Sequence, residues 1–110
     1  MQRHESDGVV ISCDFCGEDW DERKPMIEGH HGSVVCLDCL KVALDQVRPA
    51  PDQFNCTLCL RDGLPEDLPR WSPHPRPAAA NPQAIACADC IKQAAGAFHR
   101  DKDVDWSKPR

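Results

Sequence analysis

The chain has 110 residues, a formal charge of −5 and eight cysteines, which is far above ordinary cysteine usage. A sequence of this size forms one domain or two very small ones. Its polar N-terminal residues precede only a short apolar run, so we expect no signal peptide, and no later stretch could span a bilayer. These features predict a cytoplasmic protein whose reduced thiols serve as metal ligands rather than as disulfides.

The cysteines form four CxxC pairs, and a CxxC turn places two sulfurs on one metal ion. Joining the pairs two by two gives two tetrahedral sites and therefore two Zn²⁺ ions per chain. With every cysteine bound as a thiolate, the net charge falls to about −9. The candidate zinc ligands are Cys13, Cys16, Cys36, Cys39, Cys56, Cys59, Cys87 and Cys90.

Each half of the chain repeats one pattern after its second cysteine pair. Apolar residues follow the cysteines at the spacing of one helix face, which predicts an α-helix with the cysteines in its first turn. The first helix should end by about Arg48, because Pro49 and Pro51 cannot continue it. The two apolar stripes are Leu40, Ala43, Leu44 and Val47 in the first half, and Ile91, Ala94, Ala95 and Phe98 in the second.

The first pair of each half is predicted to lie on a zinc knuckle. Residues 9–11 and 34–35 are β-prone, and Gly17 after Cys16 suits a tight turn. We therefore predict a small metal-stabilised α+β fold of two tandem treble-clef modules, each a knuckle and β-hairpin followed by one α-helix. The first module covers residues 1–50 and the second residues 51–99, with a Pro-rich insert at about 64–82. Residues 100–110 are predicted to be a disordered tail.

Three features allow a second interpretation. Cross-bracing would join the first pair with the third and the second with the fourth, but the internal repeat favours pairing within each half. The Pro-rich insert could be a polyproline II segment for a partner, although a flexible loop is favoured. His30 and His31 could bind metal, but four cysteines already complete the first site, so a solvated turn is favoured.

The first half resembles the C4 zinc-binding domain of the ClpX unfoldase over residues 11–48. The matching features are the knuckle at residues 13–17, the pair Arg23-Lys24, the turn at residues 27–29 and the cysteine-bearing segment 35–40. The second half looks like a degenerate copy that lacks the glycine after its second cysteine. The resemblance implies zinc binding, a tendency to dimerise, and recognition of protein substrates or adaptors. It implies no ATPase activity, because no GxxxxGK[ST] phosphate loop is present.

The sequence therefore predicts a non-catalytic protein-interaction module that binds a protein partner or a second copy of itself and is linked to Clp-type proteolysis. The alternative is a nucleic-acid-binding zinc-finger regulator, which the acidic charge disfavours. A redox enzyme is disfavoured as well, because reactive CxxC motifs usually occur once. Leu37 and Val42 lie off the inward stripe of the first helix, so we predict an apolar interaction patch there.

Overall fold

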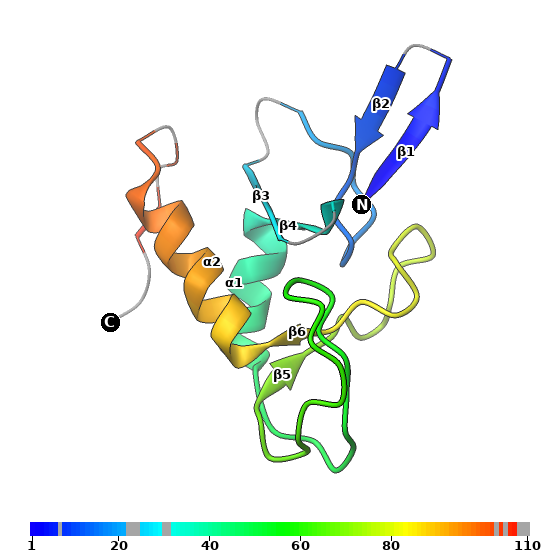
Figure 1. Cartoon of the computed structure of the whole chain (residues 1–110). Coiled ribbons are helices and arrows are strands. Elements are labelled where there is room, and N and C mark those ends of the chain that lie inside the picture. The colour runs from blue at the N-terminus through cyan, green and yellow to red at the C-terminus, as the bar shows by residue number, and fades with distance from the viewer. Residues whose placement is uncertain (7, 22–24, 30–31, 103, 105, 108–110) are drawn as a thin grey trace.

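The computed structural model describes the chain except for residues 7, 22–24, 30–31, 103, 105 and 108–110. The predictions for His30, His31, Arg23 and Lys24 therefore lie outside the described residues. The described part of the chain forms three two-stranded antiparallel sheets and two helices (Figure 1). In chain order these are β1 (Gln2–Glu5), β2 (Gly8–Ile11), β3 (Met26–Glu28), β4 (Val34–Cys36), α1 (Leu37–Gln46), β5 (Arg70–Trp71), β6 (Ala86–Cys87) and α2 (Ala88–Arg100).

The predicted fold class is confirmed: the structure is a small α+β protein with two tandem zinc modules. In the first module the β3–β4 hairpin leads directly into α1, and in the second the β5–β6 hairpin leads directly into α2. Cys36 and Cys87 are the N-cap residues of these helices rather than members of the first turn. Among the described residues, no helix has the length and apolar character needed to cross a lipid bilayer.

The two modules share one hydrophobic core. Helices α1 and α2 lie side by side (Figure 1), and the core cluster includes buried residues of both halves. Phe15 in the first knuckle is fully buried and packs against Trp71 of β5, with ring centroids 5.3 Å apart. Leu58 holds the matching position in the second knuckle and lines a cavity with Ile27 of β3. Each knuckle thus contributes its central apolar residue to a contact with the hairpin of the other module.

The Pro-rich insert is packed, so the prediction of a flexible loop is wrong for its described residues. Trp71 and Ala80 are buried, and the Trp71 indole Nε1 donates a hydrogen bond to Gln46 Oε1 of α1 at 3.1 Å. The Asn81 backbone N–H donates to the carbonyl oxygen of Asp14 at 2.8 Å. The insert is ordered because it carries a large apolar side chain and amide groups that bond to the first module.

Arg70 organises the segment that joins the two modules. Its side chain is buried, and its guanidinium donates to several backbone carbonyl oxygens while lying 4.0 Å from the centroid of the Phe54 ring. The bonded carbonyls belong to Ala50, Asp52, Pro65, Glu66 and Leu68. One buried cation therefore holds together a stretch that has little regular secondary structure.

Two further sequence predictions need correction. Leu37 is buried in the core rather than exposed, whereas Val42 is 43% exposed as expected. Leu37 is the first residue of α1, where side chains point back toward the N-terminus, and its backbone N–H bonds to the Pro25 carbonyl. In the predicted disordered tail, Val104 and Trp106 are partly buried and pack against the core.

Candidate metal centres

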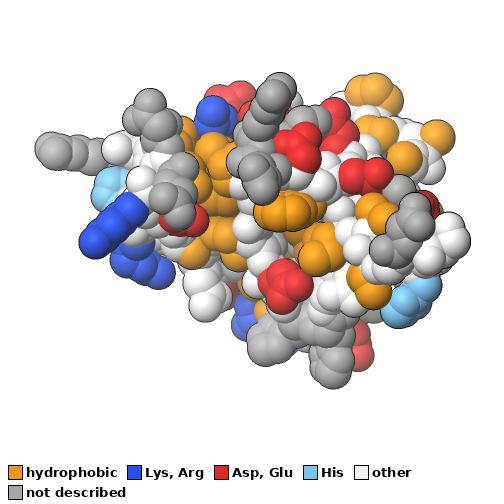
Figure 2. Space-filling model, turned by 90° about the horizontal axis from the view of Figure 1, so that it is seen from above, with side chains coloured by type: hydrophobic (Ala, Val, Ile, Leu, Met, Phe, Trp, Pro, Cys, Tyr) orange, Lys and Arg blue, Asp and Glu red, His pale blue; other side chains and the backbone are white. Residues whose placement is uncertain are grey.

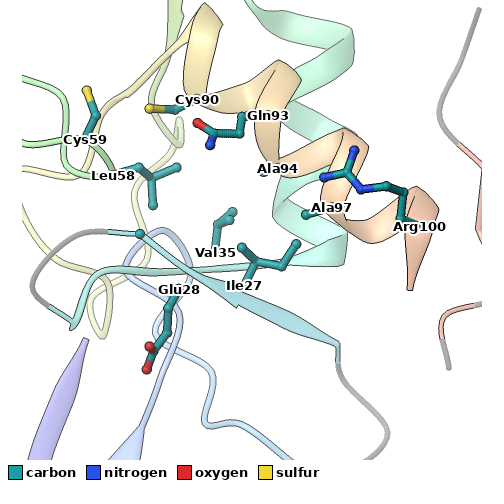
Figure 3. Close-up of a pocket in the computed structure, with 11 residues that line it drawn as sticks. Ile27, Glu28, Val35, Leu58, Cys59, Cys90, Gln93, Ala94, Ala97 and Arg100 are labelled. Carbon is teal, nitrogen blue, oxygen red and sulfur yellow. The ribbon is translucent and has the colours of Figure 1, made fainter. Parts of the chain in front are cut away.

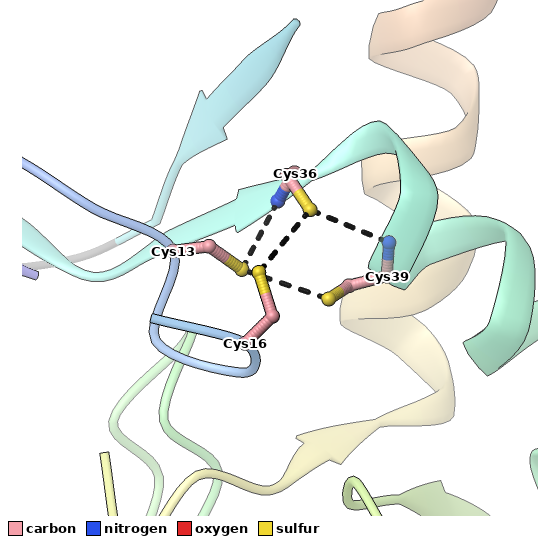
Figure 4. A group of neighbouring side chains, drawn as sticks. All are labelled: Cys13, Cys16, Cys36 and Cys39. Carbon is pink, nitrogen blue, oxygen red and sulfur yellow. Dashed lines mark hydrogen bonds between the residues drawn. The ribbon is translucent and has the colours of Figure 1, made fainter. Parts of the chain in front are cut away.

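The eight cysteines form two clusters, each made within one half of the chain. The first is Cys13, Cys16, Cys36 and Cys39, and the second is Cys56, Cys59, Cys87 and Cys90. Within each cluster the sulfur atoms lie within 4.8 Å of one another. Figure 4 shows the first cluster, where the knuckle supplies two sulfurs and the start of α1 supplies the other two. This grouping agrees with pairing inside each half and not with cross-bracing.

The sulfur spacing fits a tetrahedral zinc ion. A Zn–S bond of about 2.3 Å in a tetrahedron places neighbouring sulfurs about 3.8 Å apart. The Sγ atoms of Cys13 and Cys39 are 3.8 Å apart, as are those of Cys16 and Cys36. In the second cluster the same distance separates Cys56 and Cys90. A disulfide would require about 2.05 Å, and all eight cysteines are free.

Backbone N–H groups surround the sulfurs, which is the environment that thiolates need. In the first cluster, Cys13 Sγ accepts from the N–H groups of Phe15 and Cys36, and Cys36 Sγ accepts from Cys39 N–H, each at 3.4 Å. In the second, Cys56 Sγ accepts from the Cys87 N–H at 3.4 Å. Such donors stabilise negative charge on sulfur without occupying a coordination position.

In the first cluster the thiols polarise one another. Hydrogen bonds from Cys36 and then Cys39 lower the pKa of Cys13 to about 2. The hydrogen bond with Cys13 raises the pKa of Cys36 to about 12, and the bond with Cys13 also raises the pKa of Cys39 strongly. Burial raises the pKa of Cys16. Without a metal ion, one cysteine of the cluster is therefore a thiolate and its neighbours keep their protons. A divalent cation is needed for all four cysteines to be thiolates together.

In the second cluster the thiols shift one another's pKa in the same way. The hydrogen bond from Cys90 lowers the pKa of Cys56 to about 4, and the same bond raises the pKa of Cys90. Burial raises the pKa of Cys87. Cys56 therefore corresponds to Cys13 as the first thiolate of its cluster.

The knuckle turns are equivalent in the two modules although their sequences differ. The Gly17 N–H donates to the Cys13 carbonyl at 2.8 Å, and the Leu60 N–H donates to the Cys56 carbonyl at 2.9 Å. Gly17 has φ +78°, and Leu60 has φ +59°, the one positive value at a non-glycine among the described residues. The second knuckle thus keeps the left-handed conformation without the glycine that favours it.

The residue after the first cysteine ties each knuckle to its hairpin in the same way. The Asp14 N–H donates to the Val34 carbonyl at 2.9 Å, and the Val34 N–H donates to Asp14 Oδ2 at 2.7 Å. Correspondingly, the Thr57 N–H donates to the Ile85 carbonyl at 2.8 Å, and the Ile85 N–H donates to Thr57 Oγ1 at 3.0 Å. These reciprocal bonds show that the second half has the architecture of the first.

Arg61 is a residue near the second site that the sequence patterns did not single out. Its Nε donates to Cys59 Sγ at 3.1 Å and its Nη2 donates to Cys87 Sγ at 3.3 Å. The hydrogen bond to Cys59, followed by that to Cys87, raises the pKa of Arg61. Overlaying the halves could have identified it, because Arg61 follows Cys59 by two residues as Glu18 follows Cys16.

Two hollows occupy matching places beside the metal centres. One of about 380 Å³ lies between α2, the β3–β4 hairpin and the second knuckle. In Figure 3, Ile27, Val35 and Leu58 lie between the hairpin and α2, whereas Glu28 points away on the other side of its strand. The other, of about 340 Å³, lies between α1, the first knuckle and the Pro-rich insert, and Val42 lines it.

Comparison with known proteins gives one match. Residues 11–48 match the family model of the ClpX C4-type zinc finger. No curated protein and no solved structure matches the chain. The two four-cysteine clusters together with this match support two Zn²⁺ ions per chain. Residues 11–48 are thus similar to the ClpX C4-type zinc finger, and the second four-cysteine cluster fits a degenerate second copy.

Proposed function

We propose that this chain is a non-catalytic protein-interaction module in which two zinc ions hold a rigid double treble clef. Each of the eight cysteines is a ligand in this proposal, four to each ion. Four thiolates complete a tetrahedral zinc, so no coordination position remains for a water or a substrate. The matched zinc-finger family is itself a non-catalytic module.

The observation that carries the proposal is an apolar rim beside the first metal centre, in which Val42 is exposed and Trp71 is buried. Val42 on α1 is 43% exposed and lines the smaller hollow together with Trp71 and Pro73 of the insert. Large apolar side chains at the edge of an ordered groove mark protein-binding surfaces. The matching position in α2 is Gln93, which is polar, so the rim belongs to the first module.

Charge supports a protein partner over nucleic acid. Zinc loading makes the acidic chain more negative, and phosphate contacts supply most non-specific nucleic-acid affinity. Arg70, one of the 13 Lys and Arg residues of the chain, is buried against backbone carbonyls rather than presented to a phosphate. Seen from above, hydrophobic side chains form a band with acidic side chains beside it, and Lys and Arg lie toward one edge (Figure 2).

The partner class we propose is a protein substrate or adaptor, or a second copy of this chain, in connection with Clp-type proteolysis. The test compares the zinc-loaded wild type with Val42→Glu and, as a matched control, Gln93→Glu. Sedimentation velocity measures self-association, and biosensor titration measures binding to a purified ClpX-type unfoldase and to its adaptors.

Val42→Glu should abolish whichever association the wild type shows, because it would bury an unpaired charge. Zinc content and helicity should stay unchanged, since Val42 is neither a ligand nor part of the core, and Gln93→Glu should bind as the wild type does. Equal binding by all three proteins, or tight salt-sensitive binding to DNA or RNA instead, would contradict the proposal.

A further inference from the structure

The second metal centre has a side-chain contact that, in the described part of the chain, has no equivalent at the first. Arg61 bonds two sulfurs of the second site, at 3.1 Å to Cys59 and 3.3 Å to Cys87. Its Nη2 also lies 3.5 Å from Oδ2 of Asp89, which helps to hold the guanidinium over the sulfurs. The matching residue in the first module is Glu18, so the cation of one site is replaced by an anion at the other.

Among the described residues, the remaining charges near the two sites cancel and leave this difference unchanged. Asp14 in the first knuckle corresponds to the neutral Thr57, whereas Asp38 and Asp89 in the first turns of the helices correspond and cancel. The α-amino group of Met1 lies 2.8 Å from Asp14 Oδ2 and offsets that carboxylate. With this ammonium counted, Glu18 against Arg61 still leaves the first site more negative by two charges.

Both sites offer a sulfur to solvent, so access alone does not separate them. Cys16 and Cys59 are the partly exposed members of their clusters, and the other cysteines are buried. Cys16 lines the hollow beside α1, and Cys59 lines the hollow beside α2. The two equivalent sulfurs are therefore distinguished mainly by the charges and donors around them.

A zinc ion with four thiolates carries a net charge of −2, and its sulfurs remain nucleophilic. A charged N–H donor withdraws electron density from a thiolate and is about twice as strong as a neutral donor. We propose that the first site is the reactive and exchangeable one, with Cys16 as its nucleophile, and that Arg61 protects the zinc of the second site from electrophiles. This inference rests on zinc occupancy and does not depend on the partner proposed above.

The reaction with a maleimide illustrates the step. The Cys16 sulfur donates its electron pair to the alkene carbon of the maleimide, which forms a C–S bond, and the adjacent carbon takes a proton from water. The product is a neutral thioether that no longer offers a thiolate to the metal, so zinc loses one ligand and leaves as the remaining thiols are protonated. No oxidant or reductant takes part.

The test treats the zinc-loaded full chain with N-ethylmaleimide, measures released zinc with a chromophoric chelator, and maps the modified cysteines by mass spectrometry. Wild type should release zinc in two phases, with Cys16 modified first. Arg61→Ala should accelerate the slow phase about tenfold. This loss of protection is in the range expected for two half-exposed charged hydrogen bonds. Arg61→Lys should restore part of the protection, and Glu18→Arg should slow the fast phase.

Two controls separate protection from folding. Lys102→Ala removes an exposed positive charge beyond the C-terminal end of α2, at the opposite end of that helix from Cys90, and should leave both phases unchanged. In the cobalt-loaded protein, Arg61→Ala should shift the thiolate-to-cobalt charge-transfer band to longer wavelength, because unbonded thiolates donate more readily, while the far-UV circular dichroism stays constant. Equal release from both sites in the wild type, or acceleration by Arg61→Ala with lost helicity and no band shift, would overturn the inference.

Discussion

The first and second modules reach the same architecture from different residues, and the comparison separates what a treble clef requires from what it tolerates. Gly17 is replaced by Leu60 at the left-handed position, and the carboxylate of Asp14 is replaced by the hydroxyl of Thr57. The four cysteines are kept in both, and so is the bond in which the N-cap cysteine N–H donates to the first sulfur of its cluster. The metal site therefore fixes the fold, while the groups that bond the knuckle to the hairpin can change chemistry.

The comparison also shows how two small modules become one body. Phe15 of the first knuckle packs on Trp71 in the hairpin of the second module, and Leu58 of the second knuckle lies beside β3 in the hairpin of the first module. Each module lacks a complete core by itself and completes it with the hairpin of the other. The β5–β6 loop is much longer than the β3–β4 loop and packs on the first knuckle.

The largest effect should come from removing one metal centre. Cys36→Ser with Cys39→Ser removes two ligands, and a structural zinc contributes about 10–16 kcal/mol to folding. Purified protein should contain about one zinc per chain, and the first half should unfold. Because the core is shared, amide hydrogen exchange should also speed up in α2. Native-like protection of α2 would show that the modules are independent, contrary to the shared core.

Zinc affinity at the first site should fall steeply as the pH falls. The pKa of Cys16, Cys36 and Cys39 is raised, so these thiols hold protons near neutral pH, whereas Cys13, with a pKa of about 2, is already a thiolate. Zinc binding then releases three protons, which predicts a loss of about 1000-fold in affinity per pH unit decrease. Competition titrations with a chelator at pH 6.5 and 7.5 measure the zinc affinity of the first site. A change of about 100-fold or less would mean that two protons or fewer are released, which would contradict this count.

Alanine substitutions at the matched knuckle residues, Phe15 and Leu58, should both destabilise the protein, and the loss should be larger for Phe15. Phe15→Ala removes a fully buried ring and should cost about 3–5 kcal/mol, and Leu58→Ala should cost about 2–5 kcal/mol. Both changes should weaken the contact between modules while leaving two zinc ions bound. Denaturant unfolding followed by circular dichroism, with metal analysis of the same samples, measures both. A value under about 1 kcal/mol for Phe15→Ala would mean that the shared core is not formed.

The smallest effects should come from the left-handed turns, and here the two modules should respond with opposite sign. Leu60→Gly removes the penalty of a side chain at positive φ and should stabilise the protein by about 1 kcal/mol. Gly17→Ala should destabilise it by more than that, because an added Cβ would also clash with the backbone of Ala79. Thermal unfolding of the zinc-loaded proteins distinguishes stabilisation from destabilisation. Destabilisation by Leu60→Gly would be evidence against the left-handed conformation at Leu60.

The local features were predictable from the sequence because they depend on spacing. The CxxC pairs and the repeated helical stripe predict two modules, and the structure pairs the cysteines within each half. The repeat also predicts a second knuckle, although Leu60 occupies the glycine position. These features concern residues close in the chain, where a turn or a helix face fixes the geometry.

The long-range features were not predictable in the same way. Trp71 lies in a segment whose proline content suggested a flexible loop, yet its ring packs on Phe15 and its indole bonds Gln46. Leu37 was assigned to a surface patch because it lies off the helical stripe, but the start of α1 is buried in the shared core. The role of Arg61 depends on two cysteines that the fold brings together. No periodicity in the sequence encodes such contacts.

The most direct test of two zinc sites closed within each half is to identify the ligands of each metal. The protein is loaded with ¹¹³Cd in place of zinc, and heteronuclear correlation NMR connects each cadmium resonance to the β-protons of its cysteines. We predict two cadmium signals, one coupled to Cys13, Cys16, Cys36 and Cys39 and the other to Cys56, Cys59, Cys87 and Cys90. A signal coupled to cysteines of both halves, or a single bound cadmium, would contradict the account.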